Sequence, residues 1–135
     1  MLPAAHRNQQ ALSQFQIAAR LNPNNAATQQ SLGQLWMEAH NPERAAEAFA
    51  IASRLDPDDT DLVLYQAQAL KDSGKIAAAR ALIVNMSGAG QSAPAKLLLG
   101  DIEENSGNFE QAAAHYARAV EIAPTATSPS WHIDK

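Results

Sequence analysis

The 135-residue sequence contains no cysteine, and aromatic residues make up only 5% of it. The absence of cysteine excludes a disulfide framework, a thiolate metal site and a cysteine nucleophile. Because hydrophobic residues nevertheless reach 46%, the core must consist mainly of alanine, leucine and isoleucine. Alanine is the strongest helix former, so this composition predicts an all-helical protein.

The sequence also lacks a basic stripe and a long apolar run. Its net charge of −4 and its isoelectric point near 5.4 argue against a nucleic-acid partner, since such proteins neutralise phosphates with clustered Lys and Arg. No apolar run approaches the roughly 18 residues that a membrane span needs, and the first residues lack the apolar core of a signal peptide. We therefore expect a soluble protein without membrane insertion, and the compartment, cytoplasm or periplasm, stays open.

Motifs for catalysis or metal binding are missing as well. The four histidines are far apart and show no i, i+4 spacing. The acidic stretch 56–61 lacks the central glycine and final glutamate of a calcium loop, and the glycines before Lys96 lack the Gly-Lys-Ser/Thr junction of a phosphate loop. No serine stands in a Gly-x-Ser-x-Gly context. The sequence predicts no catalytic residue, no metal site and no cofactor.

What the sequence does contain is a repeat. From Leu32-Gly33, a small, an aromatic, a small and a proline residue follow at offsets of 13, 17, 20 and 25. From Leu99-Gly100, the same offsets lead to the same residue classes. In chain order the two sets are Ala45, Phe49, Ala52 and Pro57, then Ala112, Tyr116, Ala119 and Pro124.

The remaining units are less complete. One repeat period before Pro57 stands Pro23, which ends the second half of an earlier unit. A worn middle unit keeps the small and apolar classes, for example at Ala67 and Ile83. The two complete units end at Pro57 and Pro124, and the separation of these prolines is one residue less than two periods of 34 residues. The middle unit is therefore one residue short, and the shortfall is predicted within 86–92.

A 34-residue period with these residues resembles the tetratricopeptide (TPR) repeat family, over about residues 4–124. The resemblance implies an all-α, right-handed solenoid of antiparallel helix pairs, with about three full repeats and an N-terminal half repeat in 1–124. An irregular tail is expected at 125–135. The predicted helices cover residues 4–21, 26–39, 42–54, 60–73, 75–87, 93–106 and 109–122.

Packing explains the repeated residue classes. The small residues Gly33, Ala67 and Gly100 are expected where the two helices of one repeat cross, because a small side chain lets the backbones approach. The bulky residues at the aromatic position, Phe49 and Tyr116 among them, are expected to fill the space between repeats. Proline ends each second helix because it cannot continue the hydrogen-bond ladder.

The family resemblance also implies a binding surface. In TPR proteins the first helices of successive repeats line a concave groove that binds peptides. The groove positions of this chain are Gln30, Gln34, Met37, Leu64, Tyr65, Gln68, Lys71, Leu97, Asp101 and Glu104, with Ser31 and Leu98 beside them; packing in the core is the alternative role for each. The positions of the basic clamp in chaperone-tail-binding TPRs hold no basic residue here, which favours a basic or apolar ligand over an acidic tail.

The sequence therefore predicts a non-enzymatic scaffold or adaptor that binds a protein or peptide partner in this groove. The alternative is the TPR portion of a longer protein with an enzymatic domain, glycosyltransferase- or sulfotransferase-like, or with a polysaccharide-export domain. The chain begins in mid-repeat, which favours the alternative or a divergent first helix that caps the stack. Because both end helices carry apolar residues, self-association through them is also expected.

Overall fold

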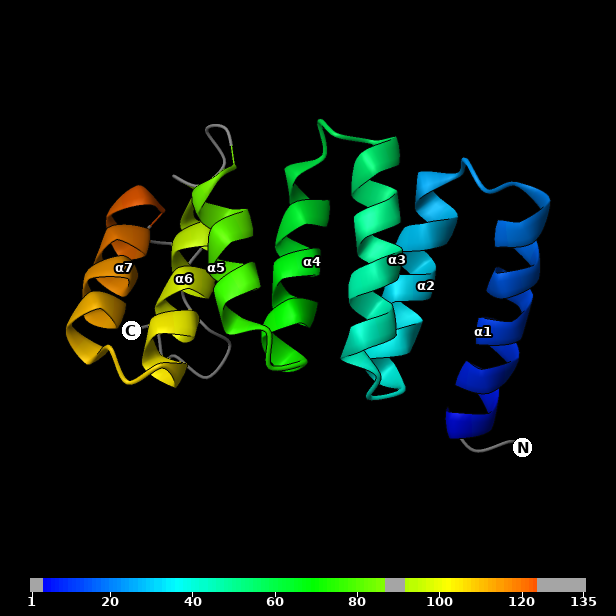
Figure 1. The fold of residues 1–135 in the computed structure, drawn as a ribbon, viewed down its shortest axis with the longest axis horizontal. Helices are drawn as coiled ribbons and strands as arrows, with labels where there is room; N and C mark the ends of the chain where they lie inside the picture. The colour runs from blue at the N-terminus through cyan, green and yellow to red at the C-terminus, as the bar shows by residue number, and fades with distance from the viewer. Residues whose placement is uncertain (1–3, 87–91, 124–135) are drawn as a thin grey trace, which may run out of the picture. The chain divides into compact units, whose positions relative to one another are not determined.

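The computed structural model describes residues 4–86 and 92–123, and within these residues it contains seven helices and no strand (Figure 1). The seven predicted helices are confirmed, with ends within one or two residues except at the fifth. That helix ends at Val84 rather than at residue 87, and residue 87 lies outside the described residues. The helices are α1 (Ala4–Leu21), α2 (Ala26–Glu38), α3 (Pro42–Leu55), α4 (Thr60–Asp72), α5 (Ile76–Val84), α6 (Ala93–Asn105) and α7 (Phe109–Ile122).

The chain divides into two compact units, with the boundary between Ala79 and Arg80 inside α5. In the first unit, α1 packs on α2, α2 on α3 and α3 on α4, each antiparallel to the helix before it (Figure 1). In the second unit, α6 and α7 form an antiparallel pair. The predicted tail at 125–135 lies outside the described residues.

The turns within the helix pairs share one backbone geometry. After α2, the N–H of His40 donates to the carbonyl of Met37 at 3.0 Å, and the N–H of Asn41 donates to Trp36 at 2.8 Å. The turns at Gly74 and Gly107 form the same two bonds at the same distances. This is a Schellman motif, which needs one residue in the left-handed region, and φ is 61°, 89° and 83° at these three positions.

Asn, Asp and Ser side chains cap the N-termini of four helices. The Oδ1 atoms of Asn25, Asn41 and Asp59 accept backbone N–H groups at the starts of α2, α3 and α4, at 3.1–3.2 Å. Ser92 caps α6 in the same way at 3.3 Å. Asp59 follows Asn25 by one full repeat period, whereas Ser92 follows Asp59 by one residue less. The missing residue of the middle repeat therefore lies between Asp59 and Ser92, and most of its predicted location, 86–92, is outside the described residues.

The core of the first unit is built from alanines around one aromatic ring. Ala45, Ala46, Phe49 and Ala69 are buried together, with Trp36, Met37 and Leu70 packed against them. A methyl group at Gly33 would lie 2.6 Å from a ring carbon of Phe49. The small residue at the α2–α3 crossing is therefore needed to make room for the ring.

Phe49 also reaches the next helix pair. Its ring centroid lies 5.5 Å from that of Tyr65 on α4, with the planes tilted by 37°. The prediction that this residue fills the space between repeats is therefore correct but incomplete, because the same ring covers Gly33 of its own repeat. The α6–α7 pair repeats the arrangement, since Tyr116 lies over Gly100 with no room for a side chain there.

Candidate functional site

Four of the predicted groove residues line one hollow in the first unit. It has a volume of about 320 Å³, and its walls come from α2, α3 and α4. The lining residues are Gln34, Met37, Glu38, Phe49, Tyr65 and Gln68. Gln30, Leu64 and Lys71, which are half-buried, do not line it.

The inner part of this hollow is apolar. Phe49 is only 2% exposed and is held by the core, whereas Tyr65 is 39% exposed and presents its ring to the surface. Met37 lies between the core and the hollow. A ligand group placed here would contact mainly the Tyr65 ring and the Met37 thioether, which together favour an apolar side chain.

Polar groups stand beside this apolar surface. The Gln68 carboxamide donates to Asp72 Oδ1 at 3.1 Å, and Glu38 Oε1 accepts a bond from Asn8 of α1 at 3.0 Å. Lys71 Nζ lies 4.0 Å from the same Asp72 oxygen. These bonds fix the carboxylates of Glu38 and Asp72 near the hollow.

A second hollow of about 260 Å³ shares Met37 with the first. Its other lining residues are His40, Pro42 and Asp72. The surface of the first unit therefore offers two neighbouring hollows that share Met37. The first is mainly apolar and includes Glu38, and the second includes Asp72.

The groove positions of the second unit are used differently. The hydroxyl of Tyr116 lies 2.5 Å from Asp101 Oδ1 and 2.9 Å from Glu104 Oε1. Burial raises the pKa of Tyr116, and the hydrogen bonds and charges of the two carboxylates raise it further. Leu97 is half-buried beside them, and Leu98 is only 7% exposed, so Leu98 belongs to the core rather than to a binding surface.

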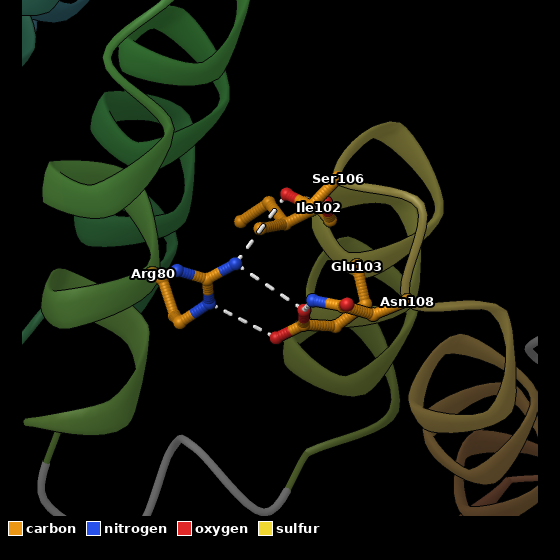
Figure 2. Close-up of polar contacts among 5 residues, drawn as sticks. All are labelled: Arg80, Ile102, Glu103, Ser106 and Asn108. Atoms are coloured by element: carbon orange, nitrogen blue, oxygen red, sulfur yellow. Dashed lines mark hydrogen bonds and ion pairs between the residues drawn. The ribbon is translucent and has the colours of Figure 1, made fainter.

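The second unit contains an ion pair that the sequence reasoning missed (Figure 2). Arg80 of α5 donates from Nε and Nη2 to the two carboxylate oxygens of Glu103 on α6, at 2.9 and 3.2 Å. Asn108 donates to the same carboxylate at 2.8 Å, and Arg80 also reaches Ser106 Oγ at 3.4 Å. The hydrogen bonds from Arg80 and then Asn108 lower the pKa of Glu103 although it is buried.

The predicted groove positions include neither Glu38 nor the Arg80–Glu103 ion pair. Of these two, only Glu38 could have been predicted from the sequence. Glu38 lies four residues after Gln34, so helical periodicity places it on the same face, but the family's groove positions do not include it. The Arg80–Glu103 pair spans 23 residues, and no local spacing rule connects residues that far apart. Only the three-dimensional arrangement brings them together.

Neither a metal-binding cluster nor a membrane-spanning helix occurs in residues 4–86 and 92–123. Among them, no three His, Asp or Glu side chains come close enough together to bind a metal ion. Within the same ranges, every helix is too short or too polar to cross a bilayer.

The chain belongs to the tetratricopeptide repeat family. The family model matches in three overlapping segments, residues 4–60, 31–94 and 64–127. No curated protein matches the sequence.

Solved structures of similar fold include MamA, with a TM-score of 0.75 and 19% identity over 92% of this chain and 77% of that one. A second MamA structure, MamA MSR-1 C2, has a TM-score of 0.76 and 15% identity over 89% of this chain and 70% of that one. Pseudomonas aeruginosa PilF has a TM-score of 0.64 and 21% identity, over 89% of this chain and 55% of that one. At these identities the likeness establishes the fold.

Proposed function

We propose that this chain is a protein-binding scaffold that holds a segment of a partner protein on the predicted groove surface, without catalytic activity of its own. The observation that carries this proposal is the 320 Å³ hollow, because four residues chosen from the family's groove positions line it together. Its apolar walls and neighbouring amide groups are the usual composition of a recognition surface.

The test is affinity capture from the source organism with matched variants. The wild-type chain should retain specific proteins that are lost when Met37→Glu and Tyr65→Ala are combined. The control is Gln14→Glu, which adds the same charge at an exposed position of α1. If the double variant retains the same proteins as the wild type, the groove surface is not where partners bind.

We also propose self-association through the end helices. On α1, Leu21 is 82% exposed and Ile17 is 42% exposed; on α7, Phe109 is 67% exposed and Val120 is 53% exposed. Such apolar side chains favour pairing with a second copy. Light scattering should show the mass rise with concentration, and a strictly monomeric mass at about 100 μM, where a contact with Kd near 10 μM is mostly formed, would contradict it.

The comparisons give no support to the alternative of a repeat segment joined to an enzymatic or polysaccharide-export domain. The family match concerns the repeats alone. The scaffold is therefore the function that we propose.

A further inference from the structure

The size of the hollow in the first unit limits what it can hold. Sites for small molecules and cofactors usually measure roughly 300–1,000 Å³, and this hollow of about 320 Å³ lies at the lower limit. One large side chain of a partner protein fits such a volume better than a nucleotide or a cofactor does.

The walls select the kind of side chain. Phe49, Tyr65 and Met37 form the apolar part of the lining. Because Phe49 is fixed by packing on Gly33, one wall is rigid, whereas the unbranched Met37 can adapt to different shapes. This combination accepts leucine, methionine or an aromatic side chain, and it rejects a charged one, which would lose its hydration.

The two glutamines suit a peptide main chain. A carboxamide both donates and accepts hydrogen bonds, so it can pair with the N–H or the C=O group of a peptide. Gln34 is exposed at the hollow. Gln68 uses one N–H for Asp72, and its carbonyl oxygen can still accept a bond from a ligand.

The charges near the hollow are mainly negative. Glu38 lines it, and Asp72 lines the neighbouring hollow, which shares Met37 and also contains His40. The nearby lysine is Lys71, which is half-buried and lies 4.0 Å from Asp72. Lys71 can offset only one of the two carboxylates, so the surface attracts a cation.

Resting on the function proposed above, we infer that the hollow receives one bulky apolar side chain of a partner segment, and that this segment carries a lysine or arginine close by in its sequence. The apolar side chain lies against Tyr65 and Met37, and the cation is attracted by Glu38. An acidic segment is excluded, because it would place its carboxylates beside Glu38 and Asp72.

The experiment selects phage-displayed random 12-residue peptides on the full chain and measures the best synthetic peptide by fluorescence polarisation. Selected sequences should share an apolar residue with Lys or Arg within four positions. Replacing that apolar residue by alanine should weaken binding at least tenfold, in line with the free energy of burying such a side chain. Glu38→Gln should weaken binding about twofold to fivefold, as for an exposed ion pair.

Two variants test the hollow itself. Met37→Glu should reduce binding at least tenfold. Because Met37 touches the core, the exposed Gln34→Lys is the second variant; it keeps the core intact and should also weaken the cationic peptides about twofold to fivefold. Gln14→Glu and Gln14→Lys make the same charge changes on exposed α1 and should leave binding unchanged.

The outcomes separate this inference from the proposed function. If the wild type selects peptides whose binding is insensitive to Met37→Glu and Gln34→Lys, or selects acidic peptides, the inference is overturned while a peptide-binding scaffold stands. If the wild type selects no peptide above background, both are overturned. If Glu38→Gln leaves binding of the cationic peptide unchanged, the assignment of the cation to Glu38 is wrong.

Discussion

The helix pairs α2–α3 and α6–α7 have the same backbone plan but different chemistry. Each has a glycine covered by an aromatic ring, Gly33 under Phe49 and Gly100 under Tyr116. On α2 the two groove positions after the glycine hold Gln34 and Met37, which line an apolar hollow. On α6 the same positions hold Asp101 and Glu104, and both contact the Tyr116 hydroxyl.

The helices α2 and α6 also differ at the position three residues after the glycine. Trp36 of α2 has the Arg44 guanidinium 5.1 Å from its ring centroid. The corresponding position of α6 is Glu103, which is buried and paired with Arg80. Asn41 is free to cap α3, whereas the amide of Asn108 is bound to Glu103 and does not cap α7. The glycine–aromatic pair maintains the fold, and the other positions are free to diverge.

The largest effect should come from removing the ring that both repeats share. We expect Phe49→Ala to lower the free energy of unfolding by about 3–5 kcal/mol, because the ring is 2% exposed and packs on Gly33 and Tyr65. Denaturant unfolding monitored by circular dichroism measures it. A loss below about 1 kcal/mol would show that the ring is not a core residue.

A bulky residue at the second glycine should break the other pair. Gly100→Leu places side-chain atoms where the Tyr116 ring lies, and overpacking of this kind costs about 1–3 kcal/mol or more. Thermal melting of the variant should show the loss, with Gly74→Ala as a control where no atom lies within 4 Å of an added methyl group. Because φ at Gly74 is 89°, the control variant should show a mild loss. A Gly100→Leu variant as stable as the wild type would mean that Gly100 does not lie at the helix crossing.

The ion pair of the second unit should give an acid-sensitive contribution. Arg80→Ala leaves the buried Glu103 carboxylate with Asn108 as its remaining partner. We expect the free energy of unfolding to fall by about 1–3 kcal/mol at pH 7. This is less than for a fully buried pair, because the Arg80 side chain is 35% exposed. Since the folded-state pKa of Glu103 is lowered, its contribution is present above the unfolded pKa and is lost as pH falls through the folded pKa. The difference in the free energy of unfolding between wild type and variant should therefore shrink as pH falls below about 4.3, the ordinary pKa of glutamate, and close as pH passes through the lowered folded-state pKa of Glu103. A difference that is constant from pH 7 to pH 3 would contradict this.

Tyr116→Phe makes the second pair resemble the first. We expect a loss of about 1 kcal/mol at pH 7, from the hydrogen bonds to Asp101 and Glu104. Because the folded-state pKa of Tyr116 is raised, this stabilisation is complete below the unfolded pKa of about 10 and is lost as pH rises through the folded value. Denaturant unfolding at pH 7 and pH 11 tests it. If the difference in the free energy of unfolding between wild type and variant widens as pH rises, the hydroxyl of Tyr116 is not the stabilising group.

The smallest effect concerns the turn that lacks glycine. His40 has φ 61°, whereas the matching turns use Gly74 and Gly107. His40→Gly should raise the free energy of unfolding by about 0.5–1 kcal/mol, because a left-handed conformation is unfavourable for residues with a Cβ atom. The melting temperature should rise. A decrease would mean that the His40 side chain forms a stabilising contact with other residues that line the second hollow.

The sequence predicted the fold well because the repeat fixes it locally. Turn residues such as Pro42 and Gly107, together with the repeat period, were enough to place all seven helices of the described ranges. The site was predictable only in part, since the hollow also needs Phe49, which the pattern identified as a core residue. Family positions cannot show that Asp101 and Glu104 contact a hydroxyl, because that contact depends on a tyrosine at the position where the other complete repeat has a phenylalanine.

The central claim, that partner segments bind the apolar hollow of α2–α4, is tested most directly by exchanging groove positions between the two pairs. One variant combines Gln34→Asp with Met37→Glu, and the other combines Asp101→Gln with Glu104→Met. Isothermal titration calorimetry with a peptide selected on the wild type should show binding lost in the first variant and retained in the second. Retention in the first variant with loss in the second would contradict the claim.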